Sequence, residues 1–386
     1  MRIGMITKYY PSSGGVATYT KYLAEAFDEE NEVYIFADKI KENEINKKKN
    51  IKVIRCWDSN VLFLISILKS VLKYKPDVIH IQQEVFLYGG ILNAMLFPYL
   101  VMLLRLFGFT VIITLHGVIP LSDLNKEFLK ENSIEGNRFI LKVGLLLIFK
   151  QIVFFSSRIL VHEEKFRNVL VEDYKCSQRK IKVIPHGVKN GQKIKNAKDI
   201  LGLKNKKVIL YFGYISGYKG IDLLINAFKL IKDKHKNWIL LFVGGVHPRL
   251  KNDEEYLKYY NDIKNSLKTH KQIYFNGYVP EDKVPLYFSA ADLVVFPHTI
   301  VMSSSGPMAL AISYSKPIIA SVAFNGILNN KEIFFDRDTY SLSKKIEDVL
   351  LNHEILNDIL AYVKKLKYAY SWTNIAKKTL QVYKNG

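Results

Sequence analysis

Cysteine is scarce in this sequence, and no apolar run is long enough to cross a bilayer. Only Cys56 and Cys176 occur among the 386 residues, which excludes a disulfide framework or a cysteine metal cluster and favours a reducing compartment. The most apolar segment, residues 91–109, is interrupted by an asparagine, a proline and an arginine. Its unbroken parts are shorter than the roughly 20 residues that span a membrane. We expect a helix buried against a sheet there.

The start of the chain, MRIGMITKYY, lacks the charged and then apolar layout of a signal peptide. This absence favours a cytoplasmic location. A peripheral position on the inner face of the membrane stays open, because the apolar residues 61–74 lie beside lysines, as an interfacial anchor requires. An anionic membrane surface is therefore one candidate partner.

Acidic residues are few relative to basic ones. The chain has 56 Lys and Arg against 36 Asp and Glu, a formal net charge of +20, and residues 151–250 alone hold 20 basic and 7 acidic residues. Such a surface attracts polyanions. No nucleic-acid partner is expected, because aromatic-rich RNA-binding patterns and known DNA-binding motifs are absent. Lysine-rich composition throughout the chain would explain the charge without any partner.

Strands and helices alternate along the chain in two sets, as in parallel sheets with helical crossovers. The expected fold is α/β, with two Rossmann-like doubly wound parallel-sheet domains facing a cleft. We expect a first domain over residues 1–188, a basic linker over 189–206, a second domain over 207–370, and a C-terminal helix over 371–386. The expected strands are 3–7, 33–37, 52–55, 78–82, 110–115, 159–162 and 182–185, then 208–212, 239–243, 273–276, 293–296 and 317–321.

The segment YFGYISGYKGIDLLINAF, residues 211–228, combines the end of an apolar strand with a glycine-rich loop and an amphipathic helix. The glycines, Gly213 among them, allow the backbone to approach a ligand. Amide groups at the helix start and the ammonium of Lys219 would favour a diphosphate. The alternative is an ordinary strand-to-helix turn with a solvated lysine.

Loops of this kind follow several expected strands. Carboxyl ends of parallel strands gather at one edge of a sheet, where ligands bind in such folds. Their common placement indicates one binding cleft. The loops are residues 11–16, 116–117, 213–220, 244–247 and 303–306.

Over nearly its whole length the chain resembles the retaining nucleotide-sugar glycosyltransferases with two Rossmann-type domains, in particular the large family numbered four. The resemblance rests on the order and spacing of several motifs rather than on one of them. They are the Gly14-Gly15 loop, IQQEVFLYGG (81–90), TLHG (114–117), IPHGV (184–188), FGYISGYKGIDLLINAF (212–228), FNGYVPEDKVPLYFSAADLVVFP (275–297) and KPIIAS (316–321).

The resemblance implies transfer of a sugar, with retention, from a nucleoside diphosphate sugar to a glycan or lipid-linked acceptor. It implies no metal and no other cofactor, the first domain on the acceptor side and the second on the donor side. A catalytic role is implied for His116, whose alternative is structural, capping the following turn. Glu84 matches the acceptor side. The implied donor-binding residues are Gly14, Gly15, Gly213, Lys219, Tyr278, Val279, Ser304, Ser305 and Gly306.

Three positions depart from the family pattern. Tyr214 replaces an arginine, and Met302 and Leu310 replace two glutamates. In one interpretation the enzyme is a divergent transferase in which Ser303 to Gly306 cradle the diphosphate. In another, the chain is a catalytically inactive subunit of a glycan assembly complex. A third, a sugar-nucleotide epimerase, shares the cleft but fits the motifs less well.

Overall fold

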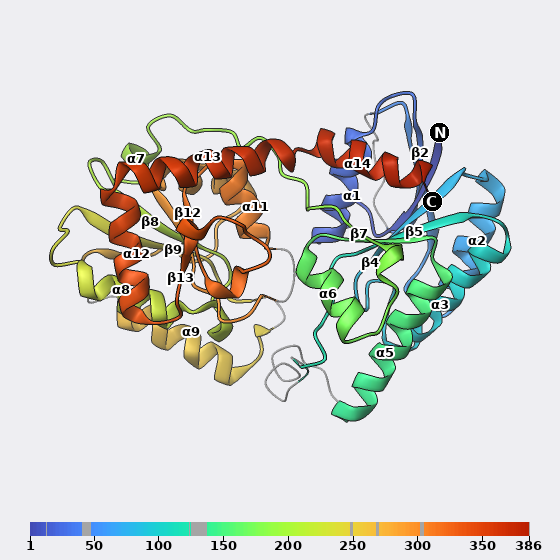
Figure 1. The fold of residues 1–386 in the computed structure, drawn as a ribbon, viewed down its shortest axis with the longest axis horizontal. Helices are drawn as coiled ribbons and strands as arrows, with labels where there is room; N and C mark the ends of the chain where they lie inside the picture. The colour runs from blue at the N-terminus through green and yellow to red at the C-terminus, as the bar shows by residue number, and fades with distance from the viewer. Residues whose placement is uncertain are drawn as a thin grey trace.

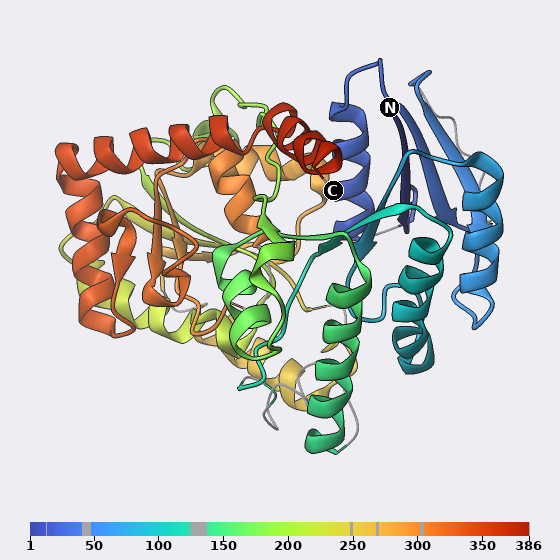
Figure 2. The same cartoon turned by 45° about the vertical axis from the view of Figure 1, so that its right-hand side comes forward.

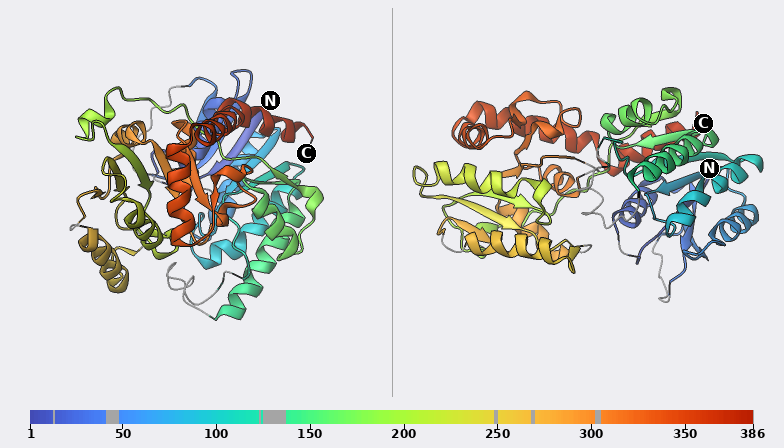
Figure 3. Two further views of the ribbon diagram at one scale, coloured as in Figure 1. Left: turned by 60° about the vertical axis from the view of Figure 1, so that its left-hand side comes forward. Right: turned by 90° about the horizontal axis from the view of Figure 1, so that it is seen from below.

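The computed structural model describes residues 1–12, 14–40, 48–122, 124, 137–247, 250–267, 270–301 and 305–385. Two lobes, each built on a parallel sheet, lie side by side in Figure 1 and remain distinct when seen from below in Figure 3. The first sheet has the order β3-β2-β1-β4-β5-β6-β7 and the second the order β10-β9-β8-β11-β12-β13. The expected fold class is confirmed.

The strands of the first sheet are β1 Arg2–Thr7, β2 Glu32–Asp38, β3 Ile51–Trp57, β4 Val78–Gln83, β5 Thr110–Leu115, β6 Arg158–Val161 and β7 Ile181–Val183. Those of the second are β8 Lys207–Phe212, β9 Trp238–Val243, β10 Ile273–Phe275, β11 Leu293–Phe296, β12 Ile318–Ser321 and β13 Phe334–Phe335. Sequence analysis missed β13, because two residues carry no periodicity.

Helices cover both faces of each sheet, which explains why β4 and β9 are buried along their whole length. In the first lobe they are α1 Gly15–Ala26, α2 Phe63–Tyr74, α3 Ile91–Leu106, α5 Arg138–Phe155 and α6 Glu164–Glu172. In the second they are α7 Ala197–Ile200, α8 Ile221–Ile231, α9 Glu254–Leu267, α10 Val284–Ala290, α11 Gly306–Ser313, α12 Thr339–Leu351 and α13 His353–Ala369.

The core of the first lobe has two parts, one on each face of the sheet. Helices α2, α3, α5 and α6 bury apolar side chains in one part. Helix α1 packs in the other together with the final helix of the chain, α14, which spans Trp372–Lys384. Figure 2 shows α14 beside α1, so the end of the chain returns to the first lobe after α13 completes the second.

Specific contacts fix this return crossing. Tyr383 Oη lies 2.6 Å from His80 Nδ1 in the buried interior. The Val188 amide donates to the Tyr370 carbonyl at 2.7 Å. The Trp372 indole lies so close to Gly187 that a Cβ atom there would overlap the ring.

Residues 189–206 connect the lobes and are held against the second one. The Gly191 amide donates to the Ser313 carbonyl at 3.2 Å, and the Ile194 amide donates to Ser289 Oγ at 2.9 Å. Lys198 pairs with Asp292 at 2.6 Å. The segment is therefore anchored backbone and not a free tether.

The contact between Gly187 and Trp372 gives a prediction for stability. Gly187→Ala should lower the free energy of unfolding by about 1 to 3 kcal/mol, because the new methyl group overpacks against the indole. Gly144→Ala is the matched control: nothing lies within 4 Å of a Cβ built at Gly144 in α5, and alanine favours a helix. Urea unfolding followed by circular dichroism measures both. Equal behaviour of the two variants would contradict the close packing.

Candidate functional site

The loops that follow β8, β9 and β10 are tied together by backbone hydrogen bonds. The Gly213 amide donates to the Val243 carbonyl at 3.0 Å, and the Gly244 amide donates to the Gly277 carbonyl at 2.8 Å. A Cβ atom at Gly244 would overlap the Gly213 carbonyl oxygen, so only glycine allows these loops to lie so close. Together they form a continuous surface at the carboxyl edge of the second sheet.

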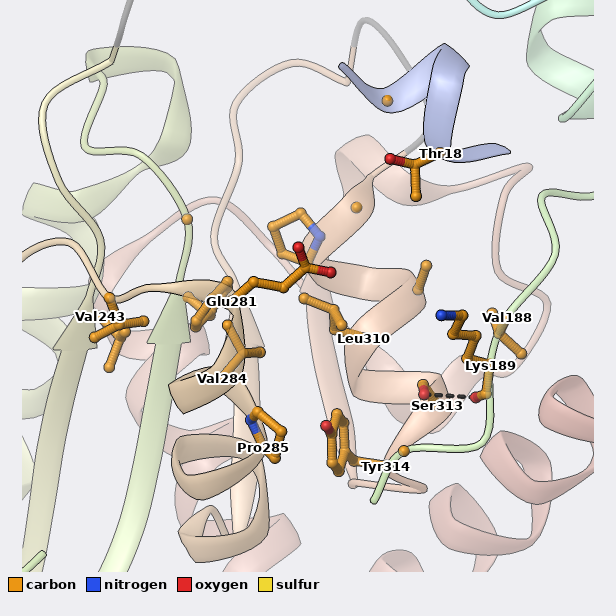
Figure 4. Close-up of a pocket in the computed structure, with 18 of the residues that line it drawn as sticks. Thr18, Val188, Lys189, Val243, Glu281, Val284, Pro285, Leu310, Ser313 and Tyr314 are labelled. Carbon is orange, nitrogen blue, oxygen red and sulfur yellow. Dashed lines mark hydrogen bonds between the residues drawn. The ribbon is translucent and has the colours of Figure 1, made fainter. Parts of the chain in front are cut away.

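This surface forms one wall of a cavity of about 780 Å³ between the lobes. Helix α1 contributes Gly15, Thr18 and Tyr19 from the first lobe, and residues 186–192 line it where the chain passes between the lobes. Figure 4 shows Thr18 facing the second-lobe residues Glu281 and Leu310 across the space. The cavity is large enough for a ligand of several rings.

Six of the implied donor-binding residues line this cavity: Gly15, Gly213, Lys219, Tyr278, Val279 and Gly306. They come from the loops after β8 and β10 and from the starts of α1 and α11. Of the five loops expected to share one cleft, residues 116–117 do not line this cavity and residues 303–304 lie outside the described residues, while the other loops contribute to it. The role of each residue in binding stays a prediction.

The Lys219 side chain is partly buried and has an unusual partner. Its ammonium lies 2.9 Å from Nε2 of the buried His298. No ion pair of Lys219 with a carboxylate occurs among the described residues. Burial lowers the pKa of Lys219 to about 8, and burial together with Lys219 lowers the pKa of His298 to about 2. The imidazole is thus a neutral acceptor, which gives the Lys219 ammonium a hydrogen bond but no negative charge.

Other charged groups at the cavity are few. Glu281 is the single carboxylate among the described residues that line it. Lys189 enters from the opposite side, where its ammonium also lies 3.5 Å from the centre of the Tyr22 ring. Lys219, Lys189 and Glu281 therefore leave the lining with a net positive charge when its histidines are neutral.

The start of α11 adds a hydrogen-bond donor. Ser305 is the N-cap, and its Oγ accepts from the Met308 amide at 3.3 Å. Pro307 has no N–H, so the Gly306 amide is the first-turn donor that remains for a ligand. The Ser305 hydroxyl is used by the helix, while Ser304, with Ser303 and Met302, lies outside the described residues.

His116 does not line the cavity. Its Nε2 lies 2.9 Å from Gln82 Oε1, and its Nδ1 lies 3.3 Å from His162 Nε2. The Tyr19 ring, which does line the cavity, packs edge-on against His116 with centroids 4.8 Å apart. His116 therefore lies behind Tyr19, and burial lowers its pKa well below the usual value. Its catalytic role stays a prediction.

Gly14 and Glu84 also lie outside the cavity lining. Gly14 precedes α1 as its N-cap with φ of 134°, and Glu84 is an exposed residue directly after β4. Tyr214 and Leu310, which depart from the family pattern, do line the cavity. The Tyr214 ring packs edge-on against His247 with centroids 5.1 Å apart.

Sequence analysis did not single out His298 or Glu281. His298 follows β11 and Pro297, so its place at the carboxyl edge of the sheet was readable from the strand pattern. Its contact with Lys219, 79 positions earlier in the chain, could not be predicted from that pattern. Glu281 begins a short 3-10 turn before α10. It lies within the motif 275–297, but nothing in that motif distinguishes it from its neighbours as a cavity residue.

Two family models match the chain. Glycosyltransferase Family 4 matches residues 13–190, and Glycosyl transferases group 1 matches residues 193–366. An uncharacterized glycosyltransferase of Methanocaldococcus jannaschii is 26% identical over 246 residues, which are 59% of this chain and 60% of that protein. The chain spans 60%, 46% and 30% of the lengths of three curated relatives.

Solved structures share the fold over the whole chain. Sucrose-phosphate synthase from Thermosynechococcus elongatus has a TM-score of 0.75 at 19% identity, covering 100% of this chain and 98% of that one. HepE of Anabaena in complex with UDP-glucose has a TM-score of 0.70 at 15% identity, with 100% of both chains covered. None of the helices in the described residues is long and apolar enough to cross a membrane.

The buried charge of Lys219 predicts a stability that depends on pH. Because the folded pKa lies below the unfolded value, the folded state binds fewer protons between about pH 8 and 10.5, and stability rises with pH there. Lys219→Met removes the penalty. Because it also leaves Nε2 of His298 without its donor, the free energy of unfolding should rise by only about 1 to 2 kcal/mol below pH 8, and the gain should vanish toward pH 10.5.

Lys316→Met is the matched control. Burial also lowers the pKa of Lys316 to about 8, but its ammonium donates to the carbonyl oxygens of Ser289 and Ala291 at 3.0 and 2.8 Å. Removal of the Lys316 ammonium leaves those two carbonyl oxygens without a donor, so we expect no gain in the free energy of unfolding. Urea unfolding at neutral and alkaline pH compares the two variants, and a loss for Lys219→Met at neutral pH would contradict the uncompensated charge.

Proposed function

Because the chain belongs to the family 4 type of GT-B glycosyltransferases, we propose that it moves a sugar from a nucleoside diphosphate sugar in the cavity to a glycan or lipid-linked acceptor. We propose further that transfer retains the anomeric configuration and needs no metal. The observation that carries the proposal is Lys219, a partly buried ammonium that lies against the neutral imidazole of His298.

A diphosphate would supply the missing negative charge. Lys219 and the Gly306 amide both border the cavity, so phosphate oxygens between them would accept charge-assisted hydrogen bonds. When the glycosidic bond breaks, negative charge grows on the departing diphosphate, and donors already fixed in place stabilise it. Lys219 and the Gly306 amide are thus suited to neutralise the charge of a departing diphosphate.

The loop after β10, which also lines the cavity, suits a nucleoside. Tyr278 and Val279 offer an aromatic ring and an apolar side chain for stacking against a base. Glu281 offers acceptor oxygens for sugar hydroxyls, which Leu310 beside it does not. HepE was solved with UDP-glucose, so UDP-glucose is the first donor to test.

The first test is calorimetric titration with a panel of nucleoside diphosphates and their sugars in the presence of a chelator. One of them should bind, and Lys219→Met should weaken it by about 1.5 to 3 kcal/mol, which is roughly 10- to 150-fold. Lys316→Met, which keeps the cavity intact, should bind like the unaltered protein. Equal affinity of all three proteins would remove Lys219 from the site.

The altered cavity favours a second candidate, a catalytically inactive binding subunit. Tyr214 and Leu310 place an aromatic and an apolar side chain where the family has charged ones. Binding of a donor without hydrolysis or transfer, over a range of acceptors, would favour this subunit. Interconversion of donor sugars without an acceptor would instead indicate an epimerase.

His116 supplies a separate prediction about the reaction. If His116 acts on the sugar, through or beside Tyr19, His116→Ala should slow transfer while nucleoside diphosphate affinity stays nearly unchanged. His162→Ala is the matched control, because His162 belongs to the same ring cluster and also contacts Tyr19. Initial rates and calorimetry separate the effects. Equal losses of rate and affinity in both variants would assign His116 a structural role.

A further inference from the structure

Helices α2, α3 and α5 cover one face of the first sheet, and their outer sides are apolar as well as their inner ones. The inner side of α3 buries Phe97, Leu100 and Leu104 completely. On its outer side, Ile91 is 60% exposed, Met95 55% and Leu106 73%. A helix of a lobe surrounded by water normally carries polar side chains on that outer side.

Helix α5 repeats this arrangement beside α3. Val143 and Leu147 are exposed one helical turn apart, and Phe154 is 74% exposed near the end of the helix. Figures 1 and 2 show α5 next to α3, with the start of α5 extending beyond the body of the lobe. The exposed apolar side chains therefore form stripes along two neighbouring helices, and contiguous exposed apolar surface of this kind marks an interaction site.

All charged side chains on these helices are basic. Among the residues of α2, α3 and α5 there is no Asp or Glu. The basic residues are Lys69, Lys73, Arg105, Arg138, Lys142 and Lys150. By contrast α9, an outer helix of the second lobe, carries Glu254, Glu255 and Asp262 with its lysines. A lysine-rich composition of the whole chain therefore does not explain why α2, α3 and α5 carry basic residues and no acidic ones.

We propose that the outer face of α2, α3 and α5 rests on the surface of an anionic lipid bilayer. Apolar side chains would enter the boundary between head groups and acyl chains, and the lysines and arginines would pair with lipid phosphates. The absence of acidic side chains on these helices favours a polyanionic surface over a second copy of this basic chain. Docking of this kind holds the helices flat on the surface.

The position of this helical face determines where a docked bilayer would lie relative to the cavity. Helices α3 and α5 follow β4 and β5, so both begin at the carboxyl edge of the first sheet, the edge that borders the cavity. A bilayer under these helices would lie beside the cavity opening. Docking itself does not depend on the reaction proposed above.

Flotation of the purified full chain with vesicles tests the proposal. The protein should float with vesicles of phosphatidylcholine and phosphatidylglycerol, stay behind with phosphatidylcholine alone, and be released by high salt. The double variant Lys69→Gln and Lys150→Gln should bind about 25-fold more weakly, since each removed charge costs about fivefold. Its control, Lys364→Gln with Lys365→Gln on exposed α13 positions, should bind like the unaltered chain.

A second pair of variants tests the apolar contribution. Leu106→Ser with Phe154→Ser should reduce vesicle binding, whereas Tyr340→Ser with Tyr368→Ser, equally exposed on the second lobe at 70% and 77%, should not. Circular dichroism and the calorimetric titration establish that each variant is folded. Failure to float at low salt, or loss that is equal in face and control variants, would overturn the proposal. So would a dimer in solution that the face variants dissociate.

Discussion

All strands of both sheets run parallel, and the position of the cavity follows from this constraint. A parallel connection must carry the chain back to the opposite edge of the sheet before the next strand, usually along a helix, so the loops at the carboxyl ends of the strands gather at one edge. In the second sheet, the loops after β8, β9 and β10 share backbone hydrogen bonds there. The first sheet brings α1 to the same space, and α14 and the anchored segment 189–206 join the lobes. The topology of the two sheets thus sets the position of the cavity, whichever side chains line it.

The cavity contains a charged group, the Lys219 ammonium, whose burial is not explained by a contribution to folding. The Lys219 ammonium is withdrawn from water and faces an imidazole, which gives it a hydrogen-bond acceptor but no negative charge. Lys316 shows the alternative in the same lobe, a buried lysine whose ammonium is satisfied by backbone carbonyl oxygens. Desolvation of Lys219 is a cost to stability that an anionic ligand would offset. The contrast between the two lysines is the reason why we propose a binding role for Lys219 and a structural role for Lys316.

The sequence was informative about the fold because its signals are local. Strands such as β5 and β11 were predicted with their observed bounds, since continuous apolar runs bounded by turns mark buried parallel strands. The glycine loops after β8 and β9 indicated where the cavity lies. The contact of Lys219 with His298, and the position of His116 behind Tyr19, join residues from separate elements through side-chain packing. Periodicity does not encode such contacts. Ser305 shows a related limit, because the pattern does not reveal that its hydroxyl caps α11.

The two lobes differ in what their outer helices present to the surroundings. On the second lobe, acidic and basic residues alternate on α9, as expected of a surface that faces water. On the first lobe, apolar stripes lie among basic side chains and no acidic residue interrupts α2, α3 or α5. If the first lobe rests on a bilayer through those helices, the second lobe is held to it through α14 and the anchored segment 189–206. The contacts of Tyr383 with His80 and of Trp372 with Gly187 fix that crossing.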